Sequence, residues 1–178
     1  MEMTGERALT VDQATAWAAL NDVAVLQRCV FGCESIVATG PDTYDILINV
    51  AIGPVKTRLK GQIALAEIDA PRQYILRFQG QAGAAGFARG EAQVALDPVT
   101  GGQTLLRYRV AAQVGGKLAQ VGSRLIDAAA ATMADRFFSA FSEHFVANGK
   151  RALATPPPAK RELWSTLVTF VRRLFQAH

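Results

Sequence analysis

The middle of the chain alternates between apolar and polar residues in the way that antiparallel strands require. Residues 43–53 and 55–69 have apolar side chains at almost every second position, and similar alternation returns at 72–80, 86–97 and 103–114. A period of two places the apolar side chains on one face of a strand. Such strands predict an antiparallel sheet with one covered face and one face in water.

The segment before these strands predicts one further strand and two short helices. Residues 2–10 read as the strand. Asp12 is the expected N-cap of the first helix, which has Trp17 and Leu20 on one face. A second short helix is expected to begin at Asn21-Asp22 and to continue through residues 23–30.

One long helix is predicted behind the strands. Residues 117–148 contain no proline and have apolar side chains at three- and four-residue steps from Leu118 to Phe145. This spacing predicts a helix that begins after the glycine pair ending at Gly116 and ends at Gly149. At 1.5 Å per residue it is about 45 Å long, enough to cross a whole curved sheet.

The order of these elements predicts an α+β fold. A strand, two short helices, about six antiparallel strands and one long helix is the layout of the START-like helix-grip fold, also called SRPBCC. In that fold a curved antiparallel sheet wraps around a long C-terminal helix. An apolar cavity usually remains between the sheet and the helix.

Small residues indicate where such a cavity lies. Glycine and alanine alternate along one strand face from Gly86 to Ala92, and the long helix contains Gly122 and four alanines at 128–131. Facing small residues permit either close backbone packing or a hollow. With a hollow, the predicted lining is Ile48, Leu59, Leu76, Phe78, Gly90, Tyr108, Leu125, Ala129, Met133 and Phe137.

Composition and charge narrow the class of protein. Half of the 178 residues are apolar, no uninterrupted apolar run is long enough to span a bilayer, and the polar N-terminus does not resemble a signal peptide. We therefore expect a cytoplasmic protein with Cys29 and Cys33 as free thiols. Six cations and one acid follow residue 149, so the net charge of +4 leaves the body of the chain near −1. That distribution disfavours a nucleic-acid-binding surface on the body.

The sequence offers little catalytic or metal-binding chemistry. Cys29 and Cys33 have no second ligand pair for tetrahedral zinc, so no metal is expected. The glycine-rich residues 80–90 lack the spacing of a dinucleotide site. Among the inward positions only Tyr74 and Tyr108 could act as acid or base. The leading hypothesis is a non-enzymatic carrier. A cyclase- or aromatase-like enzyme of this fold and an assembly factor with a filled core stay open as alternatives.

Four segments resemble the CoxG family, named for the G subunit of carbon monoxide dehydrogenase. They are ALNDVAVLQRCVFGCESI (19–36), IGPVKTRLKGQIAL (52–65), GFARGEAQVAL (86–96) and AQVGGKLAQVGSRLIDAAAATMADRFF (112–138). The resemblance covers about residues 1–149, and GGKLAQVGSRLI is its most specific part. Phe31 stands where the family usually has proline, which bears on the shape of that loop and not on the fold.

This resemblance implies a START-like module that accompanies molybdenum-containing carbon monoxide dehydrogenases and related hydroxylases without being the redox enzyme. Members of the family are linked to attachment of the dehydrogenase to the cytoplasmic membrane. They are also proposed to carry a quinone that connects the enzyme to the respiratory chain. For this chain the resemblance implies no covalently bound cofactor, and menaquinone or ubiquinone as the carried ligand.

A further segment follows the predicted domain of residues 1–149. Residues 150–160 form a basic, proline-rich linker, and residues 161–178 predict an amphipathic helix that is too short and too charged to cross a bilayer. Its wide apolar face with arginines opposite is typical of a helix in the membrane interface, here the cytoplasmic face. A helix that enters a groove of a partner protein, or that packs on its own domain, is the alternative. The residues expected to contact the membrane are Leu163, Trp164, Leu167, Phe170, Val171, Arg172, Arg173, Leu174 and Phe175.

Overall fold

The computed structural model describes residues 1–154, with side chains through residue 147. The elements in chain order are β1 (Glu2–Leu9), α1 (Gln13–Leu20), α2 (Val23–Cys29), β2 (Cys33–Gly40), β3 (Thr43–Ile52), β4 (Val55–Asp69), β5 (Gln73–Gln81), the 3-10 turn η1 (Gly83–Ala85), β6 (Phe87–Val99), β7 (Gln103–Gly115), α3 (Lys117–Gln120) and α4 (Ser123–Ala154). The predicted order of a strand, two short helices, about six strands and a C-terminal helix is confirmed. No residue range was predicted for one of these strands, β2.

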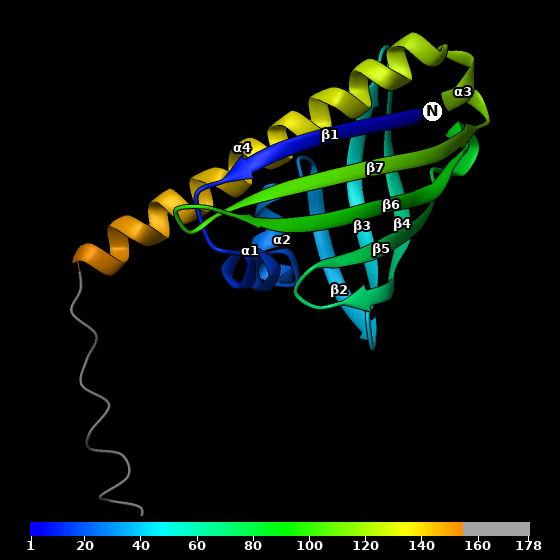
Figure 1. The fold of residues 1–178 in the computed structure, drawn as a ribbon. Helices are drawn as coiled ribbons and strands as arrows, with labels where there is room; N and C mark the ends of the chain where they lie inside the picture. Colours follow the sequence, from blue (N-terminus) through cyan, green and yellow to red (C-terminus); the bar gives the residue numbers. More distant parts are fainter. Residues whose placement is uncertain (155–178) are drawn as a thin grey trace, which may run out of the picture. The chain divides into compact units, whose positions relative to one another are not determined.

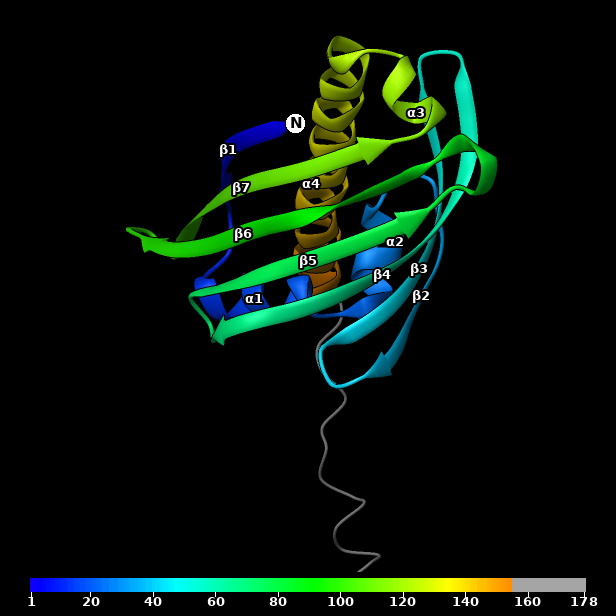
Figure 2. The same cartoon turned by 90° about the vertical axis from the view of Figure 1, so that its right-hand side faces the viewer.

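The seven strands form one antiparallel sheet in the order β1-β7-β6-β5-β4-β3-β2. The sheet curves around the N-terminal part of α4, and α1 and α2 lie on the same side of the sheet as α4 (Figures 1 and 2). The register places Leu96 opposite Leu106 and Tyr74 opposite Val94 on this concave side. The architecture is therefore the predicted helix grip.

The convex face of the sheet carries charged side chains that pair across neighbouring strands. Arg107 Nη1 lies 2.6 Å from Asp97 Oδ2, and Arg107 Nε lies 3.9 Å from Glu6 Oε2. Arg77 Nε lies 3.8 Å from Glu91 Oε2. Exposed pairs of this kind contribute at most about 1 kcal/mol each. The convex side is thus the solvated face that the alternating pattern predicts.

Aspartate caps start both short helices. Asp12 Oδ1 accepts a hydrogen bond from the Thr15 backbone N–H at 2.9 Å, which confirms the predicted N-cap of α1. Asp22 Oδ1 accepts one from the Ala24 backbone N–H at 2.8 Å at the start of α2. A cap of this kind satisfies a helical N–H that otherwise lacks a partner. The two caps fix where the chain turns at one end of the sheet.

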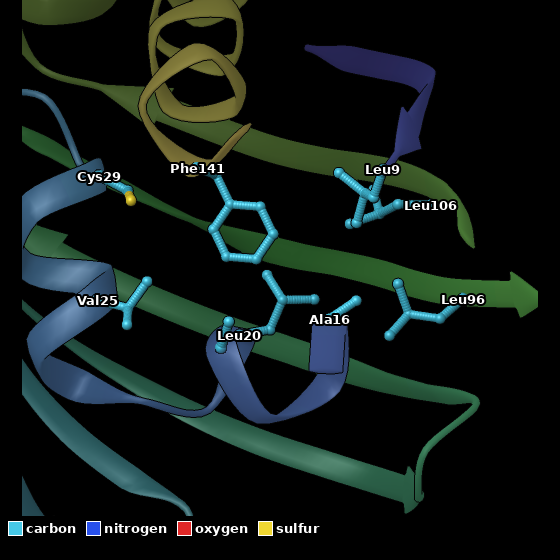
Figure 3. Close-up of a cluster of buried hydrophobic side chains, with 9 residues drawn as sticks. Leu9, Ala16, Leu20, Val25, Cys29, Leu96, Leu106 and Phe141 are labelled. Carbon is cyan, nitrogen blue, oxygen red and sulfur yellow. The ribbon is translucent and has the colours of Figure 1, made fainter. Parts of the chain in front are cut away.

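The hydrophobic core lies at the end of the sheet covered by α1 and α2. Figure 3 shows the ring of Phe141 pointing from α4 into the centre of this cluster. Phe141 is fully buried, and Leu9, Leu96 and Leu106 of the sheet are almost completely buried. The buried members of the cluster are Leu9, Ala16, Ala19, Leu20, Val25, Cys29, Leu96, Leu106 and Phe141. Residues Met1–Phe145 form one compact unit around this core.

The C-terminal helix differs from the prediction at both ends. The chain breaks into α3 and α4 at Gly122, whose φ of +93° is incompatible with a continuous helix. At the other end α4 continues through Gly149 to Ala154, into the predicted linker. A single glycine costs a helix only about 1 kcal/mol, and good helix formers on either side outweigh it.

The predicted C-terminal tail falls beyond the part of the chain that the structure describes. The rest of the linker after Ala154 and the amphipathic helix of residues 161–178, with all nine residues expected to contact a membrane, lie outside the described residues. Within residues 1–154, no helix combines the length and the hydropathy that crossing a membrane requires.

Candidate functional site

An apolar pocket of about 190 Å³ lies on the concave side, between the sheet, α2 and the middle of α4. Strand alternation brings the sheet residues to this side, and Leu20 of α1 and Leu26 of α2 add to the lining. The lining consists of Leu20, Leu26, Val30, Ile36, Tyr44, Ile46, Ile63, Leu65, Tyr74, Leu76, Val94, Leu106, Tyr108, Phe137 and Phe138. The only polar atoms in these side chains are three tyrosine hydroxyls.

The three tyrosine side chains have different surroundings. The hydroxyl of Tyr108 lies against the backbone of Gly5 on β1, where even a Cβ would collide with it. The Tyr108 ring stacks on Phe138 with centroids 5.3 Å apart. Tyr74 is 5% exposed, and its ring packs edge to face with that of Trp17, with centroids 5.5 Å apart. Tyr44 is half-buried and also borders a surface hollow beside Phe78.

The environment of Tyr74 keeps its hydroxyl protonated. Burial raises the pKa of Tyr74, and nearby Tyr44 raises it further. Deprotonation is therefore further from physiological pH than for a free tyrosine, whose pKa is about 10. At neutral pH this hydroxyl can donate one hydrogen bond and accept others.

A second hollow of about 310 Å³ lies further toward the N-terminal end of α4. Its lining is Phe31, Asn49, Val50, Ala51, Gly53, Leu125, Ala128, Ala129, Thr132, Met133 and Arg136. The guanidinium of Arg136 sits 4.0 Å from the centroid of the Phe31 ring, a cation–π contact that joins the α2–β2 loop to α4. Val30 borders the apolar pocket and Phe31 borders this hollow, so the two spaces are neighbours across that loop.

Other depressions are less suited to an apolar ligand. One of about 420 Å³ lies over the convex face and is lined in part by Glu67, Arg107 and Arg109. Those side chains are exposed and charged. The concave pocket is therefore the candidate ligand site.

The ten residues predicted to line a cavity fall into three groups. Leu76, Tyr108 and Phe137 line the apolar pocket. Leu125, Ala129 and Met133 line the second hollow, where Leu125 is 43% exposed. The remaining four, which line neither of these two spaces, are Ile48, Leu59, Phe78 and Gly90.

Gly90 serves close packing rather than a hollow. A Cβ at this position would lie 2.8 Å from Ala112 Cα and 2.9 Å from the Phe78 ring, and would collide with the Ala111 carbonyl oxygen. The absence of a side chain thus lets β6 approach β7 while Phe78 packs over it. Of the two explanations for the small residues, close packing applies here.

Most of the lining was not assigned to the pocket from the sequence. Period-two alternation places Tyr44, Ile46, Ile63, Leu65 and Leu106 on the covered face, and that signal could have included them. Leu20, Leu26, Val30 and Ile36 come from α1, α2 and the edge strand β2. No local pattern shows which part of the sheet those elements cover.

Both cysteines have thiols with raised pKa values. Burial raises the pKa of the Cys29 thiol despite the neighbouring Arg28, and burial also raises the pKa of Cys33. Both are free thiols, and because their pKa values are raised they stay protonated near pH 7. Among the described side chains no three His, Cys, Asp or Glu residues are grouped so that they could hold a metal ion.

A seven-stranded antiparallel sheet curled around a helix, with an apolar pocket between them, defines the START-like helix-grip class. Solved structures agree. A conserved protein from Geobacillus kaustophilus superposes with a TM-score of 0.78 at 29% identity, over 82% of this chain and 95% of that one. A START superfamily protein from Mycobacterium smegmatis gives a TM-score of 0.65 at 12% identity, over 80% and 95% of the two chains.

The same fold also occurs in an enzyme. The Zhui aromatase/cyclase from Streptomyces sp. R1128 has a TM-score of 0.58 at 9% identity, over 81% of this chain and 92% of that chain. Identity this low shows the shared fold alone. Comparison with curated proteins gave no match.

The family follows from the sequence itself. Residues 5–146 match the family described as the G subunit of carbon monoxide dehydrogenase (CoxG). The match spans most of the chain and nearly all of the helix-grip domain. This chain belongs to the CoxG family.

Proposed function

We propose that this protein is a non-enzymatic carrier of a quinone, either menaquinone or ubiquinone. We further propose that it brings a molybdenum-containing carbon monoxide dehydrogenase or related hydroxylase to the cytoplasmic face of the membrane. The observation that carries the proposal is the apolar concave pocket, whose side chains offer no polar atoms except tyrosine hydroxyls. Membership of the CoxG family supports the choice of partner enzyme. The predicted amphipathic helix of residues 161–178 would supply the membrane contact.

The lining favours a carrier over an acid–base catalyst. The side chains that face the pocket within the described residues include no carboxylate, imidazole or amine. General acid–base catalysis uses groups whose pKa lies near the working pH, and the pKa of Tyr74 is shifted away from it. For a proton-transfer step, the enzyme alternative therefore has only tyrosine hydroxyls in this pocket.

The size of the pocket suits part of a quinone. Its volume of about 190 Å³ is below the roughly 300–1,000 Å³ of sites that enclose a whole drug-sized ligand. We propose that the quinone ring occupies this pocket. The isoprenoid chain would then leave past the Val30–Phe31 loop toward the hollow beside Met133.

A fluorescence titration tests the binding. Trp17 touches Tyr74 and is one of two tryptophans in the chain, so a Trp164→Phe background leaves a single reporter beside the pocket. A short-chain menaquinone should quench its emission in a saturable manner. Val94→Phe should raise the Kd about tenfold or more, because a larger side chain beside Tyr74 takes up pocket volume.

The matched control is Gln93→Phe, which adds an aromatic ring to the exposed side of the same strand. It should leave the Kd unchanged. Equal affinity of a folded Val94→Phe variant and the parent would place the ligand elsewhere. Mass spectrometry of lipid extracts from the purified protein would separately show whether a quinone is carried. A protein that contains no quinone and also fails to bind added quinone would favour the assembly-factor alternative.

A further inference from the structure

The hydroxyl of Tyr74 is a buried polar group without a partner. Tyr74 is 5% exposed, and its hydroxyl makes no hydrogen bond within the described part of the chain. Among fully enclosed side-chain oxygens and nitrogens of that part, only Asp45 Oδ1 lacks a partner. The Tyr74 hydroxyl therefore still borders open space, and the space that Tyr74 lines on the concave side is the apolar pocket.

Packing holds this tyrosine in place. The rings of Trp17 and Tyr74 meet edge to face at 80°, and Val94 lies opposite Tyr74 in the β5–β6 register. A buried hydroxyl loses its hydrogen bonds to water, and this loss is costly unless another partner replaces them. The fold thus presents one fixed, protonated donor to whatever occupies the pocket.

Tyr108 and Tyr44 do not duplicate this arrangement. The Tyr108 hydroxyl is directed against Gly5 on β1, and Tyr44 is less buried, at the border with the surface hollow beside Phe78. Phe, Leu, Ile and Val side chains supply the rest of the lining. An apolar wall with one deep donor recognises an apolar molecule that carries an acceptor oxygen.

We infer that the Tyr74 hydroxyl donates a hydrogen bond to a carbonyl oxygen of the bound lipophile, so that the pocket selects a quinone over a carbonyl-free hydrocarbon of similar shape. This inference rests on the proposed function and names the residue that recognises the ligand. Such a bond is shared between a neutral hydroxyl and a neutral carbonyl. Its removal should change affinity only moderately.

A pair of ligands and a pair of variants test the inference. Menadione has two carbonyl groups, and 2-methylnaphthalene keeps its fused rings and methyl group without them. Isothermal titration of the full chain should show that Tyr74→Phe raises the Kd for menadione about 2- to 10-fold and leaves the Kd for 2-methylnaphthalene unchanged. Gln93→Phe, on the exposed side of β6 and outside the pocket lining, is the control and should change neither value.

A spectroscopic readout separates recognition from a change in packing. The infrared carbonyl band of bound menadione should lie at lower frequency in the parent than in Tyr74→Phe. Two results would overturn the inference and leave the proposed function standing. One is a Tyr74→Phe variant with unchanged menadione Kd and unchanged carbonyl band. The other is an equal loss of affinity for menadione and 2-methylnaphthalene. If the parent binds neither menadione nor a short-chain menaquinone, the proposed function fails, and the inference fails with it.

Discussion

Two phenylalanines on α4 show how position within the fold changes the role of one residue type. Phe137 and Phe141 are one turn apart, and their rings stack with centroids 5.5 Å apart. Phe141 is fully buried in the core cluster, whereas Phe137 is partly buried and lines the apolar pocket. The sequence places both on the same apolar helical face. Their environments differ because Phe141 is enclosed by the core cluster, whereas Phe137 packs at its border and also faces the pocket.

Truncating these two rings should therefore have unequal effects on stability. Phe141→Ala should lower the free energy of unfolding by about 3–5 kcal/mol, the usual cost of an aromatic ring deleted from a packed core. Phe137→Ala should cost less, since part of its ring faces the pocket rather than other atoms. Urea denaturation of the two variants measures the difference. Equal losses would mean that the pocket is not open space beside Phe137.

At the scale of elements, the burial of α4 side chains differs along the length of the helix. Its C-terminal part within the compact unit carries Phe141 into the core, whereas Leu125 near its start is 43% exposed beside the second hollow. The break at Gly122 precedes this exposed stretch. Leu118 on α3, just before the break, is almost fully buried. The glycine thus lets α3 pack on the sheet while α4 starts in a different direction.

Gly122 should be intolerant of ordinary side chains. The space around it is open, because a Cβ would meet nothing within 4 Å, so any cost comes from the backbone φ of +93°. Gly122→Ala should lower the free energy of unfolding by about 1–2 kcal/mol. Gly122→Asn should cost less, because asparagine tolerates positive φ better than alanine does. Urea denaturation would contradict this account if the alanine variant matched the parent.

At the scale of the whole molecule, the charge is divided between the body and the C-terminal segment. The first 149 residues carry about −1, and the cations that make the chain basic follow them. The convex face of the sheet pairs its arginines with acids. A membrane contact that depends on positive charge would therefore come from the segment after the domain.

Liposome co-sedimentation tests this division of roles. The full chain should pellet with anionic vesicles, and a chain ending at Ala154 should stay in the supernatant. Trp164→Asp with Phe170→Asp should release the protein at any salt concentration, because the apolar contact is lost. Arg172→Glu with Arg173→Glu should weaken binding mainly at low salt, since each basic residue near an anionic surface contributes about 1 kcal/mol that salt screens.

The truncated chain is also the control for the body of the protein. If it pelleted as well as the full chain, the C-terminal segment would not be the membrane contact. If the full chain bound neutral vesicles as strongly as anionic ones, charge would not contribute to the membrane contact.

Local patterns in the sequence determined the elements of this protein. Period-two alternation predicts β3, β4, β5 and β7, and apolar spacing of three and four residues predicts the long helix. Asp12 marked the start of α1. Together with the CoxG-like segments, these signals were sufficient for the helix-grip fold. They work because strand and helix geometry depend on neighbours within a few residues.

Only the tertiary structure decided which inward residues share a space. Tyr74 and Tyr108 both face inward, yet one hydroxyl borders the pocket and the other lies against Gly5 of β1, 103 positions away from Tyr108 in the chain. Gly90 suggested a hollow and instead allows two strands to approach. Sheet curvature, strand register and the seating of α1 and α2 set these distances. Each depends on contacts between residues far apart in sequence, which no local pattern encodes.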